Sequence, residues 1–469
     1  MSKLNPLVKP ATKFVDERLA GGFGMKAAKQ DNISLLRRAV LANLLWEKVA
    51  YVDGIEVANE IARLIPLCSA LEVGNLAVNA RVLQKLRHTP LFIISEMFKH
   101  KGLYSKVAGD AIPHIITRAD MITDLVAIYW KNGKKPLPAQ MKKGLAKAFN
   151  NFNEYAFAKY DRNANIKLRD ILFLVHAKPE QGKEELYKKI ANRELKTPDT
   201  WEVALSGGAD KADTFTRLIQ ENKLGGLAML RNIRNMMESK VDKKIIKDGL
   251  DKLKNSMLLP LDFFKSARIN PEFSRDIEDA MINSYKHLPK LPGKTLFIVD
   301  VSGSMGSLTS GHSEFSRLDQ ACAMAMLAVN QCEDYDLVST AGADRNWTCS
   351  SELIKYPKKG FDLAEQIYET KKRVGGGGIF TRQCLEWCYE NVSKKYDRII
   401  IFSDSQDCDR HNKIPKPYGT YNYICDISAV KKGINYKGVW TAEISGWSEH
   451  FLTYIAAYEG IKNTFQEEQ

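Results

Sequence analysis

Through most of the first 290 residues, apolar side chains recur every three or four positions, which is the period of helices that bury one face. Ile33, Leu36, Val40 and Leu44 form one such face. Glycine and proline residues interrupt the pattern often enough to leave helices of roughly 10–20 residues. Antiparallel helix pairs that stack side by side bury many such faces at once, so the pattern predicts a HEAT-like helical repeat, as a curved stack or a closed ring.

Beyond residue 290, short apolar runs alternate with helical patterns, and this alternation predicts an α/β fold. The proline-rich segment Leu288–Gly293 separates the two patterns, so we expect a helical domain at 1–288 and an α/β domain at 289–469. The expected strands are about 294–300, 335–341, 397–403 and 437–444, and the expected helices are 317–331, 361–371, 382–394 and 449–457.

Oxygen-bearing side chains follow two of these strands and one loop. Asp300, Ser302 and Ser304 come at the end of the first strand, Asp404 closes a later one, and Thr381 follows a run of four glycines. Hard oxygens at the carboxyl ends of strands hold Mg²⁺ with several waters, and leave a position for a partner's carboxylate or phosphate. The pattern therefore predicts a magnesium site, although a turn or helix cap alone also explains Asp-x-Ser-x-Ser.

These five residues resemble the metal-ion-dependent adhesion site of a von Willebrand factor A domain. The resemblance implies an open, doubly wound α/β sheet and one divalent cation held by Asp300, Ser302, Ser304, Thr381 and Asp404. The chain departs from the family pattern in the glycine loop. In many members the threonine directly follows a Gly-Gly pair, whereas here Ile379 and Phe380 come between the glycines and the threonine.

The net charge of +13 is unevenly distributed. Residues 1–290 hold 49 lysines and arginines against 33 acidic residues, a balance of +16, whereas residues 291–469 hold 20 against 23, a balance of −3. A basic helical body beside a nearly neutral α/β domain indicates a polyanionic partner, for which RNA is the obvious candidate in a cytoplasmic protein. Solubility alone is the alternative explanation of this charge.

Several segments of the helical body resemble the TROVE module of Ro ribonucleoproteins. They are Lys142–Lys147, Ala156–Tyr160, Leu168–Pro179 and Gly225–Arg234. A TROVE module followed at once by a von Willebrand A domain is the architecture of that family, so the resemblance spans nearly the whole chain.

The resemblance implies function as well as fold. Ro proteins bind small noncoding Y RNAs on the outer surface of a helical ring and accept single-stranded 3′ ends of misfolded RNAs in its hole, and they are not catalysts. We therefore expect RNA partners in RNA quality control, and an exoribonuclease as a further possible partner. We do not expect binding to DNA or to a membrane. The candidate RNA contacts are Lys134, Lys135, Lys142, Lys143, Lys147, Lys159, Arg162, Lys167, Arg169, His176, Lys178, Arg231 and Arg234.

Each group of candidate contacts has a simpler explanation. The lysines of 142–147 also fit an ordinary solvated helix face. His176 matches the histidine of the family motif, but it also fits a buried, hydrogen-bonded histidine. Arg231 and Arg234, one helical turn apart, either contact RNA or form salt bridges with neighbouring helices.

Other functional classes find little support in the sequence. No run of about 18 apolar residues and no signal peptide occur, and the eight cysteines follow no disulfide or zinc spacing, so we expect a cytoplasmic protein. Motifs of P-loop enzymes, zinc proteases, serine hydrolases and zinc deaminases are absent, so we do not expect an enzyme. The alternative function is a metal-dependent protein-interaction scaffold without RNA binding.

Overall fold

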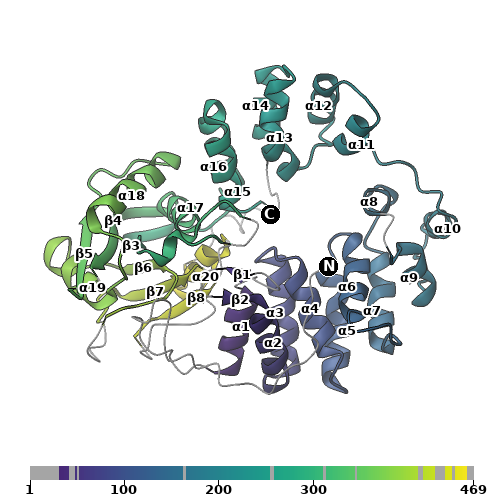
Figure 1. The fold of residues 1–469 in the computed structure, drawn as a ribbon, viewed down its shortest axis with the longest axis horizontal. Helices are drawn as coiled ribbons and strands as arrows, with labels where there is room; N and C mark the ends of the chain where they lie inside the picture. The colour runs from purple at the N-terminus through teal and green to yellow at the C-terminus, as the bar shows by residue number, and fades with distance from the viewer. Residues whose placement is uncertain are drawn as a thin grey trace. The chain divides into compact units, whose positions relative to one another are not determined.

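The computed structural model describes residues 31–41, 48–49, 52–161, 165–253, 258–309, 313–343, 346–409, 416–427, 439–445 and 449–461. The chain divides into two compact units, and helices of the N-terminal half make up most of the first (Figure 1). No helix in the described ranges is long and apolar enough to cross a membrane.

The first unit is a stack of short helices. The helices are α1 (Asn32–Leu41), α2 (Gly54–Leu64), α3 (Ala70–Val82), α4 (His88–Met97), α5 (Leu103–Ile115), α6 (Asp120–Tyr129), α7 (Ala139–Phe149), α8 (Glu154–Tyr160), α9 (Leu168–Leu174), α10 (Glu184–Asn192) and α11 (Trp201–Ser206).

Neighbouring helices of this stack bury apolar faces against one another, as a helical repeat requires. Helix α3 packs on α5, and α5 packs on α7. The last two cross closely because glycines face each other: a Cβ atom at Gly109 would lie 2.7 Å from the carbonyl oxygen of Gln140. Gly144 of α7 in turn lies against the backbone of Gly109. The expected helical repeat pattern is confirmed in this unit.

The second unit begins with five more helices and continues into a sheet. The helices are α12 (Lys211–Gln220), α13 (Gly226–Glu238), α14 (Lys243–Asp251), α15 (Pro260–Ile269) and α16 (Ser274–Ser284). The short antiparallel strands β1 (Lys48–Val49) and β2 (Val52–Asp53) are also grouped with this unit.

The sheet of the second unit has six strands in the order β5-β4-β3-β6-β7-β8. All neighbouring pairs are parallel except β4 and β5. The strands are β3 (Leu291–Asp300), β4 (Cys332–Ala343), β5 (Thr348–Leu353), β6 (Arg398–Ser403), β7 (Tyr421–Asp426) and β8 (Ala442–Ser445), and the helices are α17 (Arg317–Val329), α18 (Phe361–Val374), α19 (Thr381–Asn391) and α20 (His450–Tyr458).

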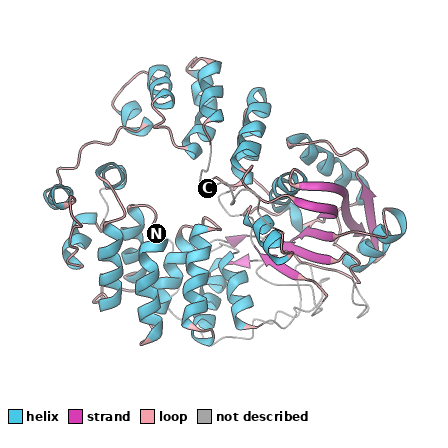
Figure 2. Cartoon of the chain, turned by 180° about the vertical axis from the view of Figure 1, so that it is seen from behind, coloured by secondary structure: helices cyan, strands magenta, loops and turns pink. Residues whose placement is uncertain are grey.

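Helices cover both faces of this sheet (Figure 2). Leu296 and Ile298 of β3 share one buried cluster with Leu385 of α19. On the opposite face, the ring of Phe297 stacks on Phe402, which meets Phe451 of α20. Alternate side chains of a strand thus contact helices on different faces, which confirms the expected doubly wound α/β fold.

Four of the six strands lie where the sequence places them, whereas β5 and β7 were missed. Strand β5 reads Thr-Cys-Ser-Ser-Glu-Leu and has no apolar run, because it is an antiparallel edge strand. Strand β7 alternates tyrosine with asparagine before Ile424, and its burial comes from β6 and β8 on either side. The sequence of β5 or β7 alone does not reveal which strands lie beside it.

Candidate functional site

The two candidate metal-binding carboxylates lie at the same edge of the sheet. Strand β3 ends at Asp300, and Asp404 directly follows the neighbouring parallel strand β6. Both side chains are fully buried. Parallel strands that are paired in register bring their carboxyl ends together, which explains why residues about a hundred positions apart meet here.

The loop that follows β3 contacts the glycine loop between α18 and α19 through glycine backbones. The amide of Gly303 donates a hydrogen bond of 3.0 Å to the carbonyl oxygen of Gly377. A Cβ atom at Gly303 would lie 2.6 Å from the carbonyl oxygen of Gly376, so only glycine fits without displacing the backbone. On either side of Gly303, the hydroxyl oxygens of Ser302 and Ser304 are 3.2 Å apart.

Thr381 is the first residue of α19 and is 1% exposed. Its amide donates to Asp407 Oδ1 at 3.3 Å, and Ile379 pairs with the same aspartate as an isolated β-bridge. Phe380 between them is fully buried. The two residues that depart from the family pattern are therefore built into the core, and Thr381 lies at the end of the glycine loop that contacts Gly303.

Two oxygens of this group have no hydrogen-bond partner among the described residues. They are Thr381 Oγ1 and Asp404 Oδ1, and both atoms are buried. A buried polar atom without a partner is costly, so such atoms mark places where a ligand or water completes the structure.

Asp300 is held by hydrogen bonds but forms no ion pair with any residue that the structure describes. Its Oδ1 accepts from the amide of Ser302 at 2.8 Å, and its Oδ2 accepts from the hydroxyl of Ser403 at 2.6 Å. Burial and then the negative charge of Asp404 raise the pKa of Asp300 to about 7, against the opposing effect of these hydrogen bonds. The two carboxylates therefore repel each other, and positive charge at this edge would stabilise both.

Arg317 is a functional candidate that the sequence reasoning missed. It is the first residue of α17, it is 1% exposed, and its Nη1 lies 2.8 Å from Asp404 Oδ2. A signal was present: Ser316 and Asp319 form a capping box that marks a helix start, and every residue of α17 is buried. An arginine in such a helix needs a carboxylate partner.

The capping residue of α17 also contacts the helical segment of the same unit. Asp319 Oδ2 accepts from the amide of Ser316 at 2.6 Å. Asp319 Oδ1 accepts from Arg268 of α15 at 2.6 Å and from the hydroxyl of Tyr368 of α18. One carboxylate thus joins the start of α17 to two other helices.

Basic side chains of the first unit lie at the surface around α7 and α9. Lys143 and Lys147 are exposed one turn apart on α7, and Lys142 is half-buried. His176, just after α9, is exposed and has a left-handed backbone with φ 52°, which excludes the alternative of a buried histidine. Lys178 is exposed, and its carbonyl oxygen accepts from Asn150 at the end of α7.

Several of the other predicted contacts lie over aromatic rings. The cations of Lys134, Lys135, Lys159 and Arg169 lie over the rings of Trp130, Tyr129, Tyr155 and Phe173, in that order, at 5.7, 4.0, 5.8 and 5.7 Å from the ring centres.

The remaining candidates are dispersed. Lys167 is half-buried at the start of α9, and Arg162 lies outside the described residues. Arg231 and Arg234 are exposed on α13 in the second unit, where Arg234 pairs with Glu238 of its own helix at 3.2 Å. The salt bridge of Arg234 thus lies within its own helix, whereas the sequence alternative placed it between neighbouring helices.

Comparison with known proteins identifies the helical segment and the fold. The model of the TROVE domain family matches residues 191–364, from α10 into α18, and therefore crosses the expected boundary at 288. No curated protein sequence matches the chain. The crystal structure of the Ro (Rsr) protein of Deinococcus radiodurans is similar, with a TM-score of 0.53 and 15% identity, over 92% of this chain and 100% of that chain. Residues 191–364 therefore resemble the TROVE domain family, and the chain has the fold of a Ro protein, in agreement with the predicted fold class.

Proposed function

We propose that the protein is a non-catalytic, cytoplasmic RNA-binding protein of Ro type. Its ligands in this proposal are small noncoding RNA related to Y RNA and the single-stranded 3′ ends of misfolded RNA, which places it in RNA quality control. The observation that carries the proposal is the exposed basic surface formed by Lys143 and Lys147 of α7, His176 and Lys178. Surface cations that are free to reach phosphates supply most of the affinity of such proteins.

The proposal predicts salt-dependent RNA binding by the full-length chain. With four phosphates neutralised on a single strand, a fourfold rise in salt is expected to weaken binding about fiftyfold, because bound cations are released from the RNA. Filter binding with a structured RNA that ends in a loose 3′ tail measures this, and the same RNA without the tail is the control. Affinity that does not change with salt would favour the protein-interaction scaffold instead.

We also propose one Mg²⁺ held by Asp300, Ser302, Ser304, Thr381 and Asp404. The oxygens without partners on Thr381 and Asp404 support this, because carboxylates and hydroxyls are the ligands that Mg²⁺ prefers. A divalent cation would also offset the repulsion that raises the pKa of Asp300. The open position on the ion would take a carboxylate or phosphate, for instance from a partner exoribonuclease.

Removal of one hydroxyl tests the metal proposal. Mg²⁺ at a hundred times its dissociation constant is expected to stabilise the wild-type chain by about 2.7 kcal/mol, and Thr381→Val is expected to lose most of this gain. Thermal unfolding with and without Mg²⁺ measures the difference. The matched control is Thr370→Val, a buried threonine whose hydroxyl donates to Ile367 within α18. A manganese-soaked crystal without an anomalous peak beside Ser302 would reject the site.

A further inference from the structure

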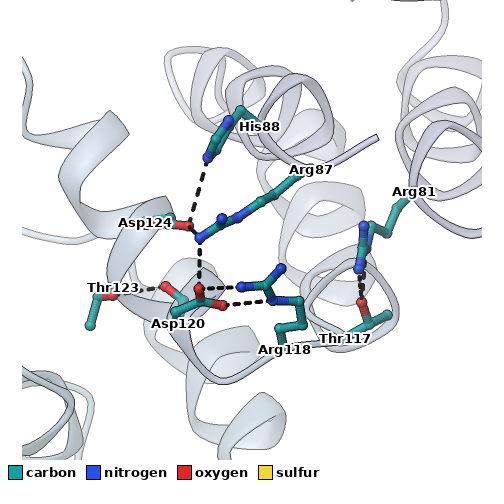
Figure 3. Close-up of polar contacts among 8 residues, drawn as sticks. All are labelled: Arg81, Arg87, His88, Thr117, Arg118, Asp120, Thr123 and Asp124. Atoms are coloured by element: carbon teal, nitrogen blue, oxygen red, sulfur yellow. Dashed lines mark hydrogen bonds and ion pairs between the residues drawn. The ribbon is translucent and has the colours of Figure 1, made fainter. Parts of the chain in front are cut away.

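Three arginines gather where the ends of α3, α4 and α6 meet in the first unit (Figure 3). Arg81 belongs to α3, Arg87 directly precedes α4, and Arg118 lies in the turn before α6. We call these three residues the arginine cluster. None of them was singled out from the sequence, and they lie outside the segment that the TROVE family model matches.

Two aspartates of α6 hold the outer members of the arginine cluster in place. Arg87 Nη2 lies 2.6 Å from Asp120 Oδ2 and 2.8 Å from Asp124 Oδ2. Arg118 Nη2 and Nε donate to the two oxygens of Asp120 at 2.8 and 3.2 Å. Both guanidinium groups are therefore fixed in position before any ligand arrives, as Figure 3 shows.

Arg81 has a structural role, by contrast. Its Nε donates to Thr117 Oγ1 at 2.8 Å, and its Nη1 donates to the carbonyl oxygens of Lys85 and Leu86 at 3.3 and 3.2 Å. Its Nη2 also donates to Thr117, so all three nitrogens of the guanidinium group take part and tie the turn after α3 to the turn before α6. Arg81 thus supplies charge but few free donors.

The site keeps an excess of positive charge after this pairing, because three guanidinium groups face two carboxylates. Burial, and then the charges of Arg118 and Arg87, lower the pKa of Arg81 to about 10. Burial, and then the charge of Arg87, also lower the pKa of His88, which favours its neutral imidazole. The part of each shift that comes from neighbouring guanidinium groups reflects a positive potential that an anion would relieve.

Donors also remain available. Arg87 Nε is buried and has no partner, and neither Arg87 Nη1 nor Arg118 Nη1 bonds any described residue. The side chains of Arg87 and Arg118 are 32% and 34% exposed, and that of His88 is 50% exposed. The unused nitrogens therefore belong to side chains that solvent can reach.

A flat surface adjoins these donors. The guanidinium carbon of Arg118 lies 4.6 Å from the ring centre of Tyr160, the last residue of α8. Unstacked bases bind on aromatic rings and on guanidinium planes, whereas an acidic protein segment would use only the charges. The combination of planar groups and free donors favours a nucleotide over an acidic peptide.

We propose that Arg87, His88, Arg118 and Tyr160 form a subsite for one unstacked nucleotide of single-stranded RNA. The base lies against Arg118 and Tyr160, and its phosphate is bound by Arg87. This subsite rests on the proposed RNA-binding function and adds to it a place for unpaired nucleotides, separate from the basic surface of α7 and α9.

Binding of a fluorescently labelled oligouridine to the full-length chain tests the subsite, with a blunt RNA hairpin as the structured comparison. Arg118→Gln and Tyr160→Leu are each expected to weaken oligouridine binding about tenfold, since stacking of one base has that order of effect. Hairpin binding should change less than twofold or so. Tyr160→Phe keeps the ring and should bind like the wild type.

The matched control is Lys188→Gln, which removes one positive charge from α10. Lys188 is 71% exposed, and its one ion pair among the described residues is with Glu185 of its own helix, at 3.6 Å. Tyr160→Leu leaves every ion pair of the arginine cluster intact, so the test survives if Arg118→Gln unfolds the chain. Thermal unfolding of each variant identifies that case.

The outcomes separate the two proposals. A wild-type chain that binds no RNA at low salt overturns the proposed function. A second outcome concerns a wild-type chain that does bind oligouridine. If Tyr160→Leu and the folded Arg118→Gln variant then bind oligouridine as tightly as the control Lys188→Gln does, only the subsite is overturned. If these variants lose affinity for a polyglutamate peptide but keep it for oligouridine, the arginine cluster serves an acidic protein partner and the nucleotide subsite is equally overturned.

Discussion

Replacing Asp404 with asparagine is expected to lower the free energy of unfolding by about 3–5 kcal/mol. The reason is the guanidinium group of Arg317, which is 1% exposed and lies 2.8 Å from the carboxylate that this change removes. Burial of a cation costs free energy because the cation loses its hydration, and the attraction of a nearby carboxylate offsets this cost. Without the carboxylate, the cost of burial is no longer offset. Urea unfolding followed by tryptophan fluorescence, in a buffer without divalent cations, measures the loss.

Two further variants make this result interpretable. Glu352→Gln breaks a partly exposed ion pair with Arg373, of 2.7 Å, and is expected to cost less than about 1 kcal/mol. The double variant Arg317→Met with Asp404→Asn removes both charges and is expected to recover much of the stability lost in the single variant. An Asp404→Asn protein as stable as Glu352→Gln would show that the buried pair does not support the fold.

Reversing the charge of Lys142, Lys143 and Lys147 to glutamate is expected to weaken RNA binding more than about a hundredfold at low salt. The change places three negative charges where phosphates would bind, so both attraction and counterion release are lost. The slope of affinity against salt should fall by about 2, one unit or slightly less for each phosphate contact removed. Filter binding over a salt series with several RNA sequences measures both effects.

The charge-matched control reverses Lys243, Lys244 and Lys247, three exposed lysines of α14. This variant has the same net charge as the α7 variant. If both variants lost affinity equally, net charge alone would explain the binding, and the surface of α7 would have no special role.

The local pattern of apolar residues was enough to predict the helical stack and the central strands, because the apolar residues of each element are the ones that become buried. Strands β3 and β6 contain the apolar runs 296–299 and 399–402 between covered faces, and every residue of α17 is buried. Strand β5 could not be predicted in the same way, since its residues form no apolar run and its place at the sheet edge comes from antiparallel pairing with β4. The segment that matches the TROVE family extends across residue 288 to residue 364.

The candidate site was predictable to the extent that its residues follow strands. Asp300 and Asp404 follow neighbouring parallel strands, so their proximity comes from the fold class alone. Arg317 and the arginine cluster could not be predicted from their position after a strand. Tertiary packing determines which residues they pair with. Arg317 pairs 87 positions away, and Arg87 pairs with Asp120 33 positions away. For Arg317, the capping box at the start of α17 was the one local signal.

The shared carboxylate of Asp319 has a mechanical consequence. One oxygen of Asp319 accepts a hydrogen bond in the first turn of α17, and the other accepts one from Arg268 of α15. A displacement of α15 would therefore also displace the turn of α17 that carries Arg317. A load applied to α15 would therefore reach the Arg317–Asp404 ion pair at the carboxyl end of β6 through only a few side chains.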